Sequence, residues 1–80
     1  MVLRIYVGNL AYETSEQDLR EAFEVHGEVQ EVSVVRDRET GRSRGFAFVE
    51  MPTNEEAQAA IGEVNGKDVG GRTLTVNEAR

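Results

Sequence analysis

Along two short segments of the chain, aromatic and cationic side chains occupy every second position. In the stretch Arg-Gly-Phe-Ala-Phe-Val-Glu-Met, the side chains of Arg44, Phe46 and Phe48 fall on one side of an extended backbone. Near the amino terminus, Arg4 and Tyr6 share a side in the same way. Flat rings can stack on unpaired bases, and arginines can contact phosphates. The pattern therefore predicts a surface suited to single-stranded nucleic acid.

Cysteine and histidine, which often act as nucleophile, base or zinc ligand, are scarce in this chain. The sequence has no cysteine and a single histidine, His26, so a disulfide framework and a thiolate zinc site are excluded. His26 falls at helical spacing with Leu19 and Phe23, which favours a packing role over that of a catalytic base. We therefore expect no enzymatic activity, no cofactor and no metal ion.

The chain is short and acidic. Its 80 residues include 15 acidic and 9 basic side chains, for a formal net charge of −6. This length allows one small domain, expected over residues 1–80, with a thin core. No apolar run approaches the ~20 residues of a membrane span, and the first residues lack the apolar stretch of a secretory signal. We expect a cytoplasmic monomer that makes no contact with membranes.

Hydrophobic periodicity predicts four strands and two helices. The strands are expected at residues 3–7, 29–36, 44–51 and 72–77. The first helix would begin at a capping box formed by Thr14 and Gln17 and stop at Gly27. A second capping box, formed by Thr53 and Glu56, would begin the other helix. Loops and turns are expected at residues 37–43, 65–66 and 70–71.

The resulting order, β-α-β-β-α-β, is that of a ferredoxin-like α+β sandwich, in which two helices cover one face of a four-stranded antiparallel sheet. Two helices leave the other face of such a sheet open to solvent. Alternation places Tyr6, Phe46 and Phe48 on that open face, and these are three of the five aromatic residues of the chain. So many exposed rings on one face predict a binding surface.

Two segments carry a resemblance to a known family. Arg44–Met51 resembles the RNP1 signature of the RNA recognition motif, K/R-G-F/Y-G/A-F-V-x-F/Y, at six of its seven constrained positions. Ile5–Leu10 is similar to the RNP2 signature of the same family. The likeness covers residues 5–80 and is nearest to small single-domain RNA-binding proteins of bacterial and organellar type. Met51 departs from the pattern, but alternation turns it inward, so we expect it to affect only the core.

The resemblance implies a role for each matching residue. Tyr6 and Phe48 would each stack on a base, Phe46 would pack against sugars between them, and Arg44 would contact a phosphate. Three residues at the end of the last strand stand where the family often reads base edges: Asn77, Glu78 and Arg80. Arginines beside the loop before the third strand could hold the backbone of the nucleic acid: Arg36, Arg38 and Arg42.

The expected partner is single-stranded RNA, bound over three or four nucleotides with micromolar affinity. Single-stranded DNA stays an open alternative, because contacts to the 2′-hydroxyl decide between the two. A different function on the same fold is a protein-interaction module that binds a basic partner through its acidic helices. An enzyme of this fold, such as an acylphosphatase, is disfavoured because residues 8–12 lack the glycine-rich phosphate loop with its arginine. We expect no small-molecule substrate.

The negative charge is concentrated in the predicted helices. Residues 13–31 carry seven acidic side chains and one basic side chain, and residues 55–63 carry three acidic ones. Residues 36–44 carry four arginines and two acidic side chains. At a Debye length of ~8 Å, charges on helices behind the sheet are largely screened at the open face. We therefore expect an acidic back and a mildly basic front.

Overall fold

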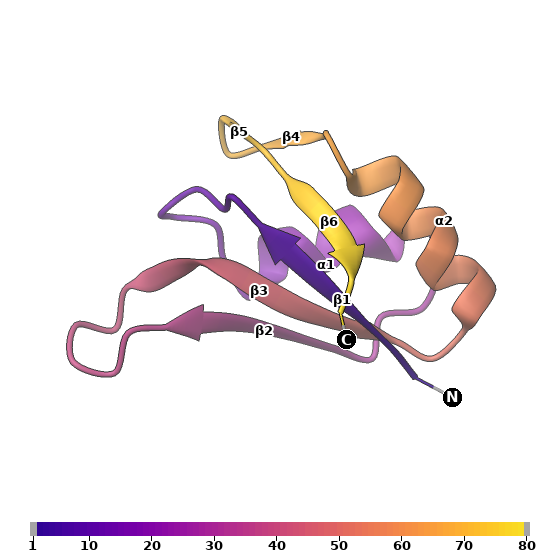
Figure 1. Ribbon diagram of the computed structural model, residues 1–80, viewed down its shortest axis with the longest axis horizontal. Helices are drawn as coiled ribbons and strands as arrows, with labels where there is room; N and C mark the ends of the chain where they lie inside the picture. Colours follow the sequence, from indigo (N-terminus) through magenta and orange to yellow (C-terminus); the bar gives the residue numbers. More distant parts are fainter. Residues whose placement is uncertain (1, 80) are drawn as a thin grey trace.

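The computed structural model describes residues 2–79 of the chain. Two helices and six strands follow one another over this range (Figure 1). In chain order they are β1 (Leu3–Gly8), α1 (Glu16–Glu24), β2 (Glu31–Arg36), β3 (Ser43–Met51), α2 (Asn54–Val64), β4 (Asp68–Val69), β5 (Arg72–Thr73) and β6 (Thr75–Glu78).

Four of the strands form one antiparallel sheet in the order β2-β3-β1-β6. Helix α1 crosses behind the strands in Figure 1 and contacts β2, while α2 contacts β1, β3 and β6. The two helices also contact each other, so both cover the same face of the sheet. The predicted ferredoxin-like α+β sandwich is thereby confirmed. Within residues 2–79, the opposite face of the sheet is left without a covering element.

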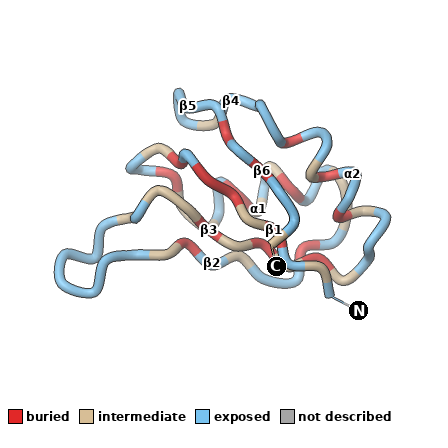
Figure 2. Tube along the Cα trace, viewed as in Figure 1, coloured by how far each residue is buried: buried red, intermediate tan, exposed pale blue. Residues whose placement is uncertain are grey.

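The core lies between the sheet and the helices. Strands β1 and β3 contribute side chains at alternate positions, among them Ile5, Val7, Ala47 and Val49, which are fully buried. Figure 2 shows this burial at the centre of the sheet, whereas the β2–β3 loop is exposed. Met51 is also fully buried, which confirms its predicted inward direction. Because strand side chains alternate strictly, the same register turns Tyr6, Phe46 and Phe48 away from the core.

Both predicted capping boxes are wrong in detail. Helix α1 is capped by Ser15, whose hydroxyl accepts a hydrogen bond from the backbone N–H of Asp18. The Asp18 carboxylate in turn accepts one from the Ser15 N–H. Thr14 lies one residue too early for this role, because its own N–H closes a turn onto Ala11 and its side chain is only 4% exposed. Thr53 does cap helix α2, but its side chain makes no capping hydrogen bond.

The predicted last strand is two strands in the structure. Residues 72–73 form β5, which pairs with β4 across a turn at Gly70 and Gly71, and both glycines have positive φ. Residues 75–78 form β6 at the edge of the main sheet. Leu74 lies between them, with backbone hydrogen bonds to Gly66 and Lys67. Its side chain is buried as predicted.

Helix α1 ends at Glu24, earlier than the predicted stop at Gly27. His26 therefore follows the helix and does not extend its apolar stripe. Among residues 2–79, no helix is long and apolar enough to cross a membrane. The same range contains no group of three histidine, cysteine or carboxylate side chains placed to hold a metal ion.

Candidate nucleic-acid interface

Four side chains form a row across the open face of the sheet. In the strand register, Ser33 of β2 stands opposite Phe48 of β3, Phe48 opposite Tyr6 of β1, and Tyr6 opposite Asn77 of β6. Residues that stand opposite each other on one face of an antiparallel pair have their Cβ atoms ~5 Å apart. The fold thus brings together three predicted site residues that lie far apart in the sequence: Tyr6, Phe48 and Asn77.

The three rings on this face form a compact aromatic cluster of Tyr6, Phe46 and Phe48. Their ring centroids lie 6.0 to 6.1 Å apart. The rings of Tyr6 and Phe46 are inclined by 29°, whereas Phe48 stands edge-on to both, at 65° and 87°. Aromatic pairs at such distances contribute ~0.5–1.5 kcal/mol each beyond their buried area. The rings therefore hold one another in place while their outer surfaces stay half-exposed.

Gly8 makes room for the Tyr6 ring. Gly8 is two positions from Tyr6 on the same strand, so a side chain there would share the open face with the Tyr6 ring. A Cβ atom added at Gly8 would lie 2.5 Å from the Tyr6 hydroxyl and 2.8 Å from its ring. Gly8 also stands opposite Phe46 in the register. The ring of Tyr6 thus extends along its own strand over Gly8, toward Phe46. A side chain at this position would push the ring off its place.

Arg4 lies on the same face as Tyr6, as their shared side predicted, but it is not among the residues to which the family resemblance assigns a contact. Its guanidinium carbon lies 4.1 Å from the centroid of the Phe48 ring, which is a close cation–π contact. Tyr6 lies two positions further along the same strand. Because strand side chains alternate between the two faces, the sequence already indicated that Arg4 shares the face of Tyr6. Arg4 thus adds a positive charge directly beside the aromatic cluster.

The arginines around the β2–β3 loop lie in different surroundings. Arg44 is exposed at the start of β3. Arg42 places its guanidinium carbon 5.6 Å from the centroid of the Tyr12 ring. Arg36 instead donates a hydrogen bond of 2.9 Å to the Glu16 carboxylate at the start of helix α1. The predicted phosphate contact of Arg36 stays a prediction, and it would have to compete with Glu16.

Two carboxylates beside these arginines have lowered pKa values. Burial alone would raise the pKa of Glu16, but hydrogen bonds from its own backbone N–H and from Arg36, together with the charge of Arg36, lower it overall. The pKa of Asp37 is lowered mainly by hydrogen bonds from the backbone N–H groups of Glu39 and Thr40, and further by the charge of Arg44. Both groups therefore stay ionised near neutral pH.

The β2–β3 loop is closed by hydrogen bonds that centre on Asp37. Its backbone N–H donates to the Arg42 carbonyl at 2.7 Å, and its own carbonyl accepts from Gly41 at 2.8 Å. Gly41 has a φ of 74°, as expected for a turn glycine. The loop thus holds Arg42 and Arg44 on a defined backbone next to the open face.

The remaining predicted residues lie at the end of β6. Asn77 is exposed beside Tyr6. Glu78 accepts a hydrogen bond from the Gln58 side chain of helix α2, so part of its carboxylate is already engaged. Arg80 lies outside the described residues.

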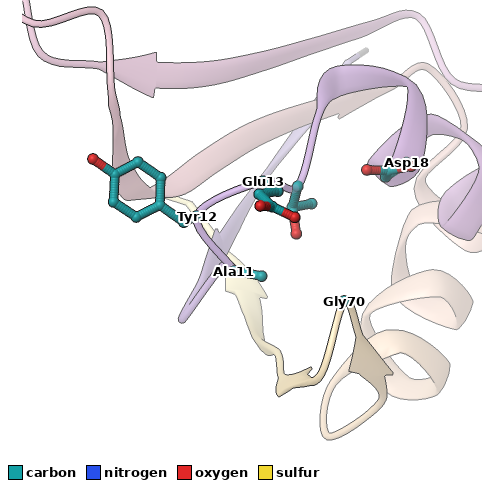
Figure 3. A pocket seen from close by; sticks show the side chains of 6 residues that line it. Ala11, Tyr12, Glu13, Asp18 and Gly70 are labelled. Carbon is teal, nitrogen blue, oxygen red and sulfur yellow. The ribbon is translucent and has the colours of Figure 1, made fainter.

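A hollow of about 400 Å³ lies away from the aromatic cluster, between the β1–α1 loop and the β4–β5 turn. Figure 3 shows Glu13 and Asp18 beside it, with Gly70 on its far side and the Tyr12 ring turned away from them. A neighbouring hollow shares Asp18 and Gly70 and is also lined by Glu21 and two charged residues of opposite sign, Lys67 and Asp68. This part of the surface is predominantly acidic.

Comparisons with known proteins agree with the geometry. The family model of the RNA recognition motif matches residues 5–75. The chain is 51% identical over 78 residues to the protein RbpD of Nostoc sp., which covers 98% of this chain and 83% of that protein. It is 48% identical over 77 residues to glycine-rich RNA-binding protein 10 of Brassica napus, of which it spans about half, 46% of the length.

The fold has close counterparts among solved structures. The crystal structure of RNA binding protein PG1 superimposes with a TM-score of 0.93 at 48% sequence identity. The match covers 96% of this chain and 93% of that one. The likeness therefore extends to both helices and the whole sheet.

Proposed function

The chain belongs to the RNA recognition motif family, and from this membership we propose that it binds single-stranded RNA on the open face of its sheet. The observation that carries the proposal is the aromatic cluster of Tyr6, Phe46 and Phe48, whose rings lie half-exposed on the face that the helices leave free. The names of the Brassica relative and of PG1, both RNA-binding proteins, support the same class of ligand.

Each ring has a distinct task in this proposal. Tyr6 and Phe48 each stack on one base, and Phe46 lies against the sugars between them. Arg44 contacts a phosphate, and Arg4 contributes positive charge beside Phe48. Asn77 lies next to Tyr6 in the register, and in this proposal it meets a base edge. The domain acts as a binding module, and none of these roles involves a chemical reaction.

The proposed affinity follows from stacking. Stacking of a base on an aromatic side chain contributes ~1–3 kcal/mol, so two or three rings supply roughly 3–9 kcal/mol before ordering of the strand is counted. A micromolar dissociation constant corresponds to about 8 kcal/mol. We therefore expect this domain alone to bind three or four nucleotides with micromolar affinity.

The Phe46→Ala/Phe48→Ala double variant tests the proposal. We expect its RNA affinity to fall at least tenfold, because one base-stacking ring and the ring that lies against the sugars are both lost, while its circular dichroism stays that of a folded domain. The matched control is Val25→Ala, which trims an exposed hydrophobic side chain, 73% accessible, at the far end of helix α1. A folded double variant with unchanged affinity would refute binding on the sheet face.

A second candidate function is the binding of a basic protein partner, and the two adjoining hollows lined by Glu13, Asp18 and Glu21 favour it. The two candidate functions can be distinguished by following backbone amide chemical shifts during two titrations, one with a short RNA and one with a lysine- and arginine-rich peptide. RNA-induced changes on β1 and β3 support the proposal. Changes confined to α1 and the β4–β5 hairpin, caused by the peptide alone, would favour the second function.

A further inference from the structure

A hollow of about 310 Å³ adjoins the aromatic face at the start of β3. It begins at Gly45, the residue before Phe46, and is lined further by Asn9, Tyr12, Arg44 and Arg72. The Gly45 carbonyl accepts a hydrogen bond of 2.9 Å from the backbone N–H of Leu10. This bond ties the β1–α1 loop to β3. A strand that leaves the aromatic cluster past Phe46 would therefore enter the hollow directly.

Tyr12 is the aromatic residue of this hollow. It is 61% exposed, more than any other large hydrophobic side chain of residues 2–79 except Val25. It contributes nothing to the core and does not belong to the aromatic cluster. Its ring already attracts a flat cationic group, the Arg42 guanidinium. An exposed ring that carries a planar group is suited to accept a base by stacking.

Positive charge lines the other side of the hollow. Arg72 donates a hydrogen bond to the side-chain carbonyl of Asn9. Asn9 is itself fixed by a bond of 2.6 Å from its side-chain amide to the Thr73 carbonyl. The guanidinium of Arg72 is thus held in place before any ligand arrives. The ion pairs that the structure describes involve Arg20 and Arg36, and neither Arg44 nor Arg72 belongs to one. Arg44 lies near enough to Asp37 to lower the pKa of that carboxylate, but both guanidinium groups can still meet an anion.

From these contacts we infer that the hollow is an additional nucleotide subsite, outside the sheet, in which Arg44 and Arg72 contact a phosphate and Tyr12 stacks on the base. This inference rests on the proposed RNA-binding function and extends it by one nucleotide beyond those on the sheet. A base between Tyr12 and Arg42 needs ~7 Å, two contact distances of ~3.5 Å. To admit a base, the Arg42 guanidinium moves outward by roughly 1–2 Å from its present position above the Tyr12 ring, or it swings to the phosphate.

The test compares short and long RNA on matched variants. Stacking tolerates every base, so oligouridylates and oligoadenylates of four and of seven nucleotides serve as probes in fluorescence anisotropy. With Tyr12→Ala, we expect the affinity for the seven-nucleotide probes to fall on the order of tenfold. The affinity for the four-nucleotide probes stays within about twofold, because the sheet alone holds them. Tyr12→Phe keeps the ring and is expected to bind both lengths like the unchanged protein.

The possible results test the subsite at Tyr12 separately from RNA binding on the sheet. Equal loss for both lengths, or no loss for the long probes, would overturn the subsite. Unfolding of Tyr12→Ala is not expected, because its ring is exposed, and a thermal melt of each variant checks this. Binding of four-nucleotide probes by the unchanged protein tests the function on the sheet separately, so a failed subsite leaves that function standing.

Discussion

Two arginines of the same hairpin differ sharply in their surroundings, and the salt dependence of RNA binding should separate them. Arg44 is exposed next to the aromatic face, whereas Arg36 is engaged by Glu16 at 2.9 Å. The variants Arg44→Gln and Arg36→Gln each remove one positive charge from this hairpin. Because Glu16 competes with a phosphate for Arg36, we expect only Arg44→Gln to change the number of phosphates that the protein neutralises, against the phosphate contact that the sequence suggested for Arg36.

The magnitude follows from counterion release. For single strands, log K falls against log salt concentration with a slope of about −0.7 for each neutralised phosphate. Four arginines lie on or beside the open face, namely Arg4, Arg42, Arg44 and Arg72. If two to four of them contact phosphates, the slope is about −1.4 to −2.8, which weakens binding roughly 7- to 50-fold between 50 and 200 mM salt.

The assay is fluorescence anisotropy of a labelled seven-nucleotide RNA at KCl concentrations across this range. Arg44→Gln should make the slope shallower by about 0.7, whereas Arg36→Gln should leave it unchanged. The ion pair of Arg36 is partly exposed and contributes ~0–1 kcal/mol to stability, so both variants should stay folded. A slope near −6 for the unchanged protein, or a shallower slope for Arg36→Gln alone, would refute this assignment of charges.

Two further predictions concern the backbone that positions the site. Gly8→Ala should displace the Tyr6 ring, because the new Cβ atom meets its hydroxyl at 2.5 Å; RNA affinity should fall about fivefold or more with little change in melting temperature. Gly62→Ala, where a new Cβ atom meets nothing within 4 Å, is the control and should bind RNA normally. Ser15→Ala should lower the free energy of unfolding by ~1 kcal/mol in urea denaturation, since it removes a side-chain cap. Thr53→Ala should cost less, because its side chain makes no such bond, and an equal loss would contradict this reasoning.

Alternation of side chains was enough to predict the fold and the aromatic cluster. A strand repeats every two residues, so burial of Ala47 and Val49 requires Phe46 and Phe48 to face outward. The family resemblance and the strand order then place Tyr6 beside them. The same rule does not settle the direction of Arg36, because the pairing of β2 with β3 shifts between Val34 and Arg36. That Arg36 points toward helix α1 follows from its hydrogen bond to Glu16.

Other features depend on contacts that the sequence does not reveal. Thr14 and Ser15 are both acceptable helix caps, and only the turn onto Ala11 decides that Ser15 takes the role. Strands β4 and β5 have two residues each, too few for any periodicity. The subsite at Tyr12 depends on the Leu10–Gly45 hydrogen bond, which joins segments 35 residues apart in the chain.

The net charge of −6 is compatible with RNA binding because many of the acidic side chains serve the helices. Asp18 completes the cap of α1, and Glu16 holds Arg36. Glu55 and Glu56 lie in the first turn of α2, where negative charge is stabilised by the helix dipole. All four belong to α1 and α2, the helices that cover one face of the sheet. The aromatic cluster in front is uncharged, and stacking on it is insensitive to net charge. We therefore expect the domain to bind single-stranded RNA mainly by stacking, with a few arginines that set the path of the strand.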